Sequence, residues 1–274
     1  MKIFVYGTLL KGMSRAKMLL DSNYLGYAMT TASLYNTGDY PGMKEGENIT
    51  IGEIYDITEK KMHYLDTVEG YEETDPDNSL FIRKEIAVQK ISNGEFIDAF
   101  AYFYNQSSET DYLIQHGDYR RYLIEQEMKY QWIIAYGSNM STERLKDRIG
   151  DFEDVKKGFI EGYKLVFNKK AFRNNAVYAN IYFAGSTDKC PAVAYYLSTD
   201  QASTLDQYEG VPDHYLRISI PFTSNNETTI AQVYIANPKM LTKENKPEKE
   251  YLNYIIQGYK EHGFNELILT SRII

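Results

Sequence analysis

Two glutamates stand in matching settings and could each act as an acid or a base. Glu69 belongs to the phrase Leu65-Asp66-Thr67-Val68-Glu69-Gly70, and Glu209 belongs to Leu205-Asp206-Gln207-Tyr208-Glu209-Gly210. A glutamate before a glycine is usually a solvated surface charge. Because the whole setting recurs, each glutamate becomes a candidate for proton transfer.

A second repeated phrase precedes each glutamate at a similar distance. It reads Val5-Tyr6-Gly7-Thr8-Leu9-Leu10 first and Ala135-Tyr136-Gly137-Ser138-Asn139-Met140 later. A glycine after a strand permits a tight turn whose successive backbone N–H groups can bind an anion. In the second copy the run from Ser138 to Arg144 reads as a loop entering a helix N-terminus, which also favours a carboxylate. A lone corner of this kind is more often an ordinary turn, but the repetition favours a binding loop.

The two phrases recur in the same order, which predicts two copies of one domain. The chain has 274 residues, enough for two domains that each build a core. We expect the domains to span residues 1–129 and 130–274, in the α+β class.

Short aromatic and β-branched runs predict that strands dominate each copy. These runs are 49–55, 84–88 and 97–104 in the first copy and 192–197, 216–220 and 230–235 in the second. Residues 58–65 and 199–205 each begin with a threonine suited to capping and predict short helices. Residues 118–128 and 247–262 predict a closing helix for each copy.

The composition excludes several classes of protein. Residues 1–129 hold 13 basic and 21 acidic residues and residues 130–274 hold 17 of each, so the net charge of −8 lies in the first copy and argues against nucleic-acid binding. No apolar run is long enough for a membrane helix, and no signal peptide is recognisable. Cys190 is the only cysteine, which favours a reducing cytoplasm. The four histidines, His63, His116, His214 and His262, lack metal-ligand spacing, so we expect no metal or cofactor.

These residues together resemble the gamma-glutamylcyclotransferase-like family, with two branches in tandem. The first half is similar to gamma-glutamylamine cyclotransferases in Tyr6-Gly7-Thr8-Leu9, Gly38-Asp39-Tyr40-Pro41-Gly42, Gly52-Glu53-Ile54-Tyr55 and Gly117-Asp118-Tyr119-Arg120. The second half is similar to gamma-glutamylcyclotransferases proper in Tyr136-Gly137-Ser138-Asn139-Met140, Glu209-Gly210-Val211-Pro212 and Tyr215-Leu216-Arg217. The combination resembles two-domain members of the bacillus type.

The resemblance implies a fold and a reaction. Each domain would be a small mixed β-barrel-like sheet flanked by helices, and would release 5-oxoproline from a small gamma-glutamyl substrate without a cofactor. Glu69 and Glu209 would be the catalytic acid/base residues. The substrate would be held by Tyr6, Gly7, Thr8 and Leu9 in one domain, and by Tyr136, Gly137, Ser138, Asn139, Met140 and Tyr215 in the other.

The two copies also differ, and other functions are compatible with the sequence. Phe81 stands where the second copy has Tyr215, and an acidic insertion, 72–79, lengthens the loop after Glu69, where we expect it to shape the pocket mouth. Non-enzymatic sensing of a gamma-glutamyl metabolite is one alternative, since fold resemblance does not fix function. Deprotection of a gamma-glutamylated biosynthetic intermediate is another, because it uses the same chemistry on a larger leaving group.

Overall fold

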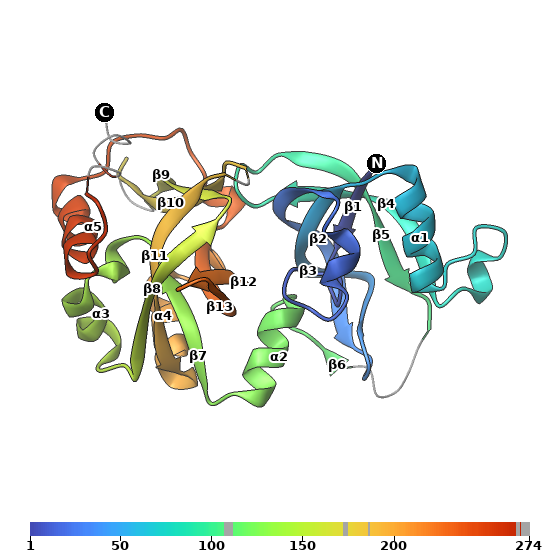
Figure 1. The fold of residues 1–274 in the computed structure, drawn as a ribbon, viewed down its shortest axis with the longest axis horizontal. Helices are drawn as coiled ribbons and strands as arrows, with labels where there is room; N and C mark the ends of the chain where they lie inside the picture. The colour runs from blue at the N-terminus through green and yellow to red at the C-terminus, as the bar shows by residue number, and fades with distance from the viewer. Residues whose placement is uncertain (107–111, 172–174, 186, 267–268, 270–274) are drawn as a thin grey trace. The chain divides into compact units, whose positions relative to one another are not determined.

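The chain folds into two compact units, Met1–Leu123 and Ile124–Ile274, in a computed structural model that describes residues 1–106, 112–171, 175–185, 187–266 and 269 (Figure 1). The division falls within helix α2 (Tyr119–Glu127), six residues before the expected boundary at 129. In the part of α2 that belongs to the second unit, Glu125 Oε1 pairs with Arg217 Nη2 at 3.0 Å.

The first unit is built on a five-stranded barrel. Its strands are β1 (Lys2–Val5), β2 (Asn23–Asn36), β3 (Pro41–Asp56), β4 (Phe81–Lys90) and β5 (Phe96–Tyr104). The order is β3-β1-β5-β4-β2, and β2 pairs with β3 to close the barrel. Only the β1–β5 pairing is parallel among these strands, and the short β6 (Tyr112–Leu113) adds to the edge of β2.

The second unit repeats this barrel. Its strands are β7 (Tyr130–Ala135), β8 (Asp154–Glu161), β11 (Lys189–Ser198), β12 (Tyr215–Ser224) and β13 (Glu227–Ala236). The order β11-β7-β13-β12-β8 matches the first unit strand for strand, including one parallel pair, β7–β13. A separate hairpin of β9 (Tyr163–Lys170) and β10 (Val177–Phe183) lies between β8 and β11 in the chain. The predicted tandem α+β fold is confirmed.

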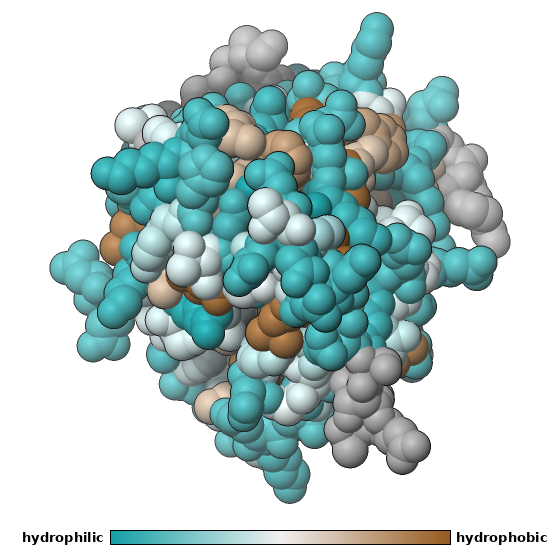
Figure 2. All heavy atoms as spheres, turned by 90° about the vertical axis from the view of Figure 1, so that its right-hand side faces the viewer, coloured by the Kyte–Doolittle hydropathy of each residue, from teal (hydrophilic) through white to brown (hydrophobic). Residues whose placement is uncertain are grey.

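Apolar and aromatic side chains fill each barrel because strand residues alternate between its two faces. Phe4, Ile54 and Met43 are fully buried in the first unit, as are Tyr195 and Phe222 in the second. The face drawn in Figure 2 is mostly hydrophilic with scattered apolar residues. Within the described residues, no helix is both long and apolar enough to cross a membrane.

The glutamate-bearing helices are α1 (Glu59–Glu69) and α4 (Thr199–Glu209). Each runs four residues beyond the predicted end, so its glutamate is the last helical residue. Gly70 and Gly210 end the helices in the left-handed region, with φ of 63° and 64°, which glycine adopts at low cost. Thr58 caps α1 as expected, but Ser198 rather than Thr199 caps α4, because Ser198 and Gln201 form a reciprocal capping box.

The remaining helices surround the barrels. The 3-10 helix η1 (Ala16–Leu19) follows the first Tyr-Gly loop, and η2 (Pro76–Asn78) lies in the acidic insertion. The second Tyr-Gly loop forms η3 (Ser138–Met140) and leads into α3 (Thr142–Ile149), as the sequence predicts. After η4 (Pro238–Met240), α5 (Lys249–Glu261) closes the second unit near the predicted range.

Candidate active sites

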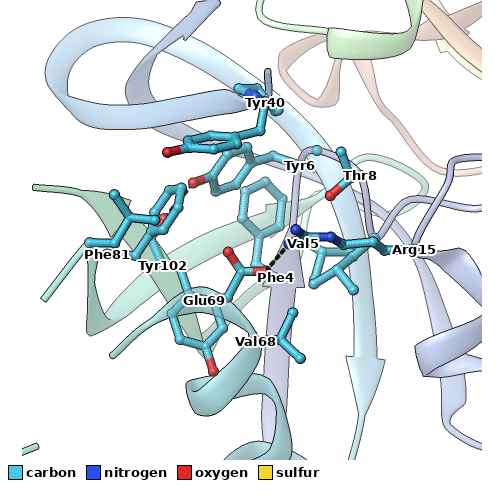
Figure 3. A pocket seen from close by; sticks show the side chains of 14 residues that line it. Phe4, Val5, Tyr6, Thr8, Arg15, Tyr40, Val68, Glu69, Phe81 and Tyr102 are labelled. Atoms are coloured by element: carbon cyan, nitrogen blue, oxygen red, sulfur yellow. Dashed lines mark hydrogen bonds and ion pairs between the residues drawn. The ribbon is translucent and has the colours of Figure 1, made fainter. Parts of the chain in front are cut away.

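The first unit has a pocket of about 540 Å³ where the Tyr-Gly loop meets the end of α1. The pocket is lined by the predicted residues Tyr6, Gly7, Thr8, Leu9 and Glu69. Figure 3 shows the Glu69 carboxylate pointing toward Tyr6, with Arg15 reaching it from the other side and Tyr40 above. The rest of the wall is mostly apolar or aromatic, from Phe4, Val5, Pro41, Val68, Leu80, Phe81 and Tyr102.

Glu69 has an environment suited to taking up a proton. Its side chain is only 11% exposed, and this burial raises the pKa of its carboxyl above the ordinary 4.5. Arg15 opposes the shift, but its Nη1 stays 3.9 Å from Oε1, beyond hydrogen-bonding distance. Glu69 is therefore a stronger base than a solvated glutamate.

The first Tyr-Gly loop is closely packed. A Cβ on Gly7 would lie 2.5 Å from the Pro41 ring, so only glycine fits there. The Leu10 N–H donates to the Gly7 carbonyl at 3.0 Å and closes the turn. In the part of the chain that the structure describes, the N–H groups of Thr8 and Leu9 have no protein acceptor. They line the pocket as potential donors to an anion.

A buried ion pair holds this loop. Arg120 of α2 donates from Nη1 to Glu53 Oε1 and to the Lys11 carbonyl, both at 2.8 Å. The Lys11 N–H donates in turn to Glu53 Oε2 at 3.0 Å. Glu53 is fully buried, so this pairing fixes the chain that follows the loop.

The second unit places its loop and glutamate together in the same way. A pocket of about 320 Å³ is lined by Tyr136, Gly137, Ser138, Asn139, Glu209 and Tyr215, all of them predicted. The N–H groups of Ser138 and Asn139 have no acceptor among the described residues, as in the first unit. Tyr251 of α5 and Tyr234 of β13 also line this pocket.

Glu209 is held more firmly than Glu69. Its Oε1 accepts hydrogen bonds from Asn139 Nδ2 and Arg148 Nη1, both at 2.9 Å. Arg148 also donates to Asn139 Oδ1 at 2.8 Å, so the three side chains form a closed triangle. Both contacts to the carboxylate end on Oε1.

Met140 does not reach the pocket that the sequence assigned to it. Its side chain is fully buried, because the next turn of the loop packs beneath α5 at Gly258, where a Cβ would lie 2.4 Å from the Met140 Cβ. Tyr195 donates to the Met140 carbonyl at 3.0 Å, and His262 Nε2 lies 3.0 Å from the same oxygen. Met140 thus anchors the loop.

Tyr215 and Phe81 occupy equivalent places at the start of β12 and β4. The Tyr215 hydroxyl donates to the Ala179 carbonyl at 2.8 Å. The Phe81 ring packs instead against Tyr40 and Tyr104, at centroid distances of 5.8 and 5.3 Å. Each ring lines its pocket, so the difference alters the wall of the site.

The aspartate of the repeated Leu-Asp pair has the same partners in both units. Tyr102 donates to Asp66 Oδ1 at 2.8 Å, and Arg83 binds Oδ2 of the same carboxylate. In the second unit Tyr234 donates to Asp206 at 2.8 Å, and Arg217 Nε lies 3.0 Å away.

The tyrosine of each Tyr-Gly loop connects that loop to the aspartate's network. The Tyr6 hydroxyl donates to the Tyr102 carbonyl at 2.6 Å, and Tyr136 donates to the Tyr234 carbonyl at 2.5 Å. Each aspartate lies one helical turn before the glutamate. The network therefore connects the glutamate's helix, two barrel strands and the binding loop.

Two arginines beside the glutamates were missed by sequence reasoning. Arg15 precedes η1, whereas Arg148 lies near the end of α3, so their distances from the Tyr-Gly phrases differ and no repeat marks them. The acidic insertion 72–79 contributes no residue to the pocket wall, in contrast to our expectation. Leu80, which follows it, does. Within the described residues no cluster of ligating side chains could hold a metal ion.

Each barrel carries a Tyr-Gly loop that faces one largely buried glutamate side chain, and comparison with known proteins identifies the family that this chain belongs to. Residues 3–121 and 133–254 both match the family described as "Gamma-glutamyl cyclotransferase, AIG2-like". The chain belongs to this family, with one match in each half, and is an enzyme of the gamma-glutamylcyclotransferase type. The family acts on small gamma-glutamyl substrates.

Similar proteins include enzymes and a tandem structure. A provisionally named gamma-glutamylcyclotransferase, MJ1514 of Methanocaldococcus jannaschii, is 32% identical over 125 residues, 44% of this chain and 96% of that protein. Gamma-L-glutamyl-butirosin B gamma-glutamyl cyclotransferase of Niallia circulans is 31% identical over 126 residues, 45% of this chain and 78% of that protein. The crystal structure of YkqA from Bacillus subtilis aligns over 98% of this chain and 95% of its own, with a TM-score of 0.79 and 21% identity, and so shares the fold.

Proposed function

We propose that each unit converts a gamma-glutamyl compound into 5-oxoproline and a free amine or amino acid, with Glu69 or Glu209 as general acid/base. One observation carries this proposal, and it holds in both units. In each unit one pocket is lined by a glutamate with a largely buried side chain and by a loop whose N–H groups have no acceptor among the described residues.

The substrate brings its own nucleophile. Its α-amine attacks the γ-carbonyl carbon, the new C–N bond closes a five-membered ring, and the bond to the leaving nitrogen breaks. Because the attack is intramolecular, the enzyme must mainly hold the glutamyl chain in a folded shape. Well-oriented groups can gain roughly 7–11 kcal/mol in this way. The loop N–H groups would provide that hold by binding the α-carboxylate.

The glutamate moves the proton. The α-amine is protonated at neutral pH, so it must lose a proton before it attacks, and the leaving nitrogen must gain one. A single carboxylate beside both atoms can perform both transfers. The raised pKa of Glu69 suits this task, because the carboxyl then holds the proton more readily between the two steps.

A product assay tests the proposal. The full chain is incubated with gamma-glutamyl amines, amino acids and peptides, and 5-oxoproline is followed by mass spectrometry. Formation of 5-oxoproline that is lost in the Glu69→Gln, Glu209→Gln double variant supports the proposal. Binding of these compounds without any 5-oxoproline would instead support a sensing protein.

The similarity to the butirosin enzyme favours adding a second kind of substrate to this assay. Its name gives gamma-L-glutamyl-butirosin B as the compound on which that cyclotransferase acts. The panel should therefore include gamma-L-glutamyl-butirosin B. Turnover of this compound above all others would make deprotection of a biosynthetic intermediate the function of this chain.

A further inference from the structure

The first unit buries one ion pair beside its site that the proposed proton transfer does not use. Glu53 of β3 and Arg120 of α2 are 0% and 3% exposed, and neither lines the pocket. Arg120 Nη1 donates to Glu53 Oε1 at 2.8 Å. Replacing a buried ion pair by apolar side chains often leaves a protein equally stable, so stability alone is a weak explanation for this pair.

The pair holds the main chain of Lys11 from both sides. The Lys11 N–H donates to Glu53 Oε2 at 3.0 Å, and the Lys11 carbonyl accepts from Arg120 Nη1 at 2.8 Å. The Tyr55 hydroxyl supports the same carboxylate, because it donates to Glu53 Oε2 at 2.7 Å. The main chain at Lys11 is therefore held by two charge-assisted hydrogen bonds, which are stronger than neutral ones.

Lys11 lies between the two parts of the chain that serve the first site. The N–H groups of Thr8 and Leu9, which have no acceptor among the described residues, come before it. Arg15, which reaches Glu69, follows it (Figure 3). The Arg15 N–H also donates to the Thr8 carbonyl at 2.9 Å, which closes this segment. A displacement of Lys11 would therefore move both the anion donors and the cation beside the glutamate.

The second unit holds the equivalent peptide group by a different means. Counted from the glycine of each Tyr-Gly phrase, the peptide group before Lys11 corresponds to the one after Met140. The Met140 carbonyl accepts a hydrogen bond from Tyr195 at 3.0 Å. In the first unit it is the N–H of this peptide group that is held, through Glu53. Both units thus fix the same point of the loop.

The strand register explains why the two anchors differ. Tyr55 and Tyr195 each pair with the residue three positions before the tyrosine of their Tyr-Gly phrase, so they are equivalent. In the same register, Val193 stands where the first unit has Glu53. Tyr195 reaches the loop itself, whereas Tyr55 reaches it through the carboxylate. The first unit therefore needs a buried charge at this place, and Arg120 balances it.

We propose that Glu53 and Arg120 are positioning residues for the reaction of the first site. By holding Lys11, they aim the loop N–H groups at the anionic end of the substrate and keep Arg15 in its place beside Glu69. This inference rests on the proposed function, which supplies the reaction to be measured. It assigns neither substrate contact nor proton transfer to the pair.

The test replaces the pair by apolar side chains. The full chain carries Glu209→Gln, so that only the first unit turns over the substrate, gamma-glutamylethylamide. Glu53→Leu with Arg120→Met removes the pair and leaves neither charge buried without its partner. Lys11 then loses both bonds, and we expect KM to rise about tenfold, the range of one charged hydrogen bond, with a smaller change in kcat.

The pH profile gives a second readout, through Arg15. Burial raises the pKa of Glu69, and Arg15 opposes this rise. Without the pair Arg15 loses its fixed place, so the fall in kcat/KM at low pH should move to higher pH. Arg15→Gln should cause the same shift, and combining it with removal of the pair should add nothing further. A purely structural pair would leave the profile unchanged in a folded variant.

Two further variants control the experiment. Glu45→Leu with Lys84→Met makes the same exchange at an exposed ion pair of the same unit and should change neither KM nor the pH profile. Arg120→Lys keeps the charge on a side chain of different shape and should raise KM less than the apolar exchange does. Thermal unfolding checks that each variant is folded, and Arg120→Lys carries the test if the apolar exchange is not.

Two outcomes would overturn the positioning role. One is a folded variant without the pair that keeps the parental KM and pH profile. The other is a fall in kcat with KM and the pH profile unchanged, because this would assign the pair to the chemical step rather than to the aim of the loop.

Calorimetry separates this inference from the proposed function. The Glu69→Gln, Glu209→Gln variant is titrated with gamma-glutamylethylamide, with and without the pair. Weaker binding at one site per chain when the pair is removed, in a protein whose parent makes no 5-oxoproline, would refute the proposed function alone. Turnover with an unchanged KM would refute the positioning role alone, and absence of both binding and turnover would refute both.

Discussion

The two sites share a chemical centre but differ in how its charge is balanced. Glu69 lies in a mostly apolar pocket with its arginine 3.9 Å away, whereas Glu209 accepts two hydrogen bonds at 2.9 Å. Burial without a close partner raises the pKa of Glu69. The same repeated phrase therefore produces two glutamates that differ in their hydrogen-bond partners.

The loops also remain in place by different means. The first is fixed by the buried pair of Arg120 and Glu53, and the second by Tyr195 and by packing against Gly258. In both units, in contrast, the aspartate one turn before the glutamate binds a tyrosine and an arginine. What both copies retain is thus this aspartate network, while the partners of the glutamate and the supports of the loop differ.

The largest effect should follow loss of both glutamates. The Glu69→Gln, Glu209→Gln variant keeps the size and hydrogen-bonding atoms of both side chains but cannot shuttle a proton. Since general acid–base catalysis contributes about 10²–10⁴-fold, we expect 5-oxoproline formation to fall at least about 100-fold, in kcat more than in KM. Each single variant should retain the activity of the other site.

Glu73→Gln is the matched control, because Glu73 is an exposed glutamate of the insertion. It should leave turnover unchanged. A double variant with the parental rate would refute the acid/base assignment.

The shared network should have the next largest effect. In the Glu69→Gln background, Asp206→Asn removes the charge that Arg217 faces and loosens the helix one turn before Glu209. We expect kcat to fall about tenfold with KM nearly unchanged, because the loop N–H groups stay in place. Steady-state kinetics over a range of pH measures this.

A structural role alone would give a different pattern. Asp206→Asn would then lower the melting temperature without changing kcat at a temperature where the variant is folded. Tyr234→Phe is a useful comparison, because it removes one hydrogen bond and leaves the Asp206–Arg217 pair. It should cost less activity than Asp206→Asn.

Much of each site could be predicted because its parts are continuous phrases. Each Tyr-Gly loop and each glutamate lies within a phrase of a few residues, and the ordered repeat predicts them in equivalent domains.

The ends of the helices were less well predicted. A glycine that ends a helix in the left-handed region follows the last helical residue, so Gly70 already implied that Glu69 is helical. The sequence alone does not distinguish Ser198 from Thr199 as the cap of α4, because both are hydroxyl residues. Only the hydrogen bond between Ser198 and Gln201 decides between them.

The charged neighbours of the glutamates could not be predicted from the repeat. Lys169 reaches the second site from β9, about 40 residues before Glu209 in the chain, through a hairpin whose register depends on tertiary packing. Arg15 and Arg148 come from segments that fold differently after the loop, one into η1 and one into α3. Such residues carry no local signal, since a lysine or arginine near a turn is usually solvated.

The pH dependence should distinguish the two sites. In the Glu209→Gln background only Glu69 acts as base, so kcat/KM should fall as pH drops through its pKa, which lies above the ordinary 4.5. Arg15→Gln removes the charge that opposes the rise in the pKa of Glu69, so the fall in kcat/KM should move to still higher pH. A fall centred at or below pH 4.5 in the Glu209→Gln background would contradict the role assigned to burial.

The ionisation of Glu69 should also make the stability of the fold depend on pH, in the opposite direction to activity. Because folding raises the pKa of Glu69, the folded state binds the proton more tightly, and this contribution is full below pH 4.5 and is lost as pH rises through the folded pKa. Glu69→Gln should therefore raise the melting temperature of the chain more at pH 7 than at pH 4. Calorimetric scans at both pH values measure the difference.

The smallest effect should come from exchanging the ring at the pocket wall. Tyr215→Phe leaves the Ala179 carbonyl without its donor, so we expect the second unit to lose about 0.5–1.5 kcal/mol of unfolding free energy, with kcat/KM changed less than about threefold. Phe81→Tyr should change turnover by the first unit as little, since Phe81 acts through packing against Tyr40 and Tyr104. Urea unfolding and kinetics in the matching Glu→Gln backgrounds measure both variants. If Tyr215→Phe instead raised KM tenfold at unchanged stability, its hydroxyl would contact the substrate, and the difference between the two rings would be catalytic rather than structural.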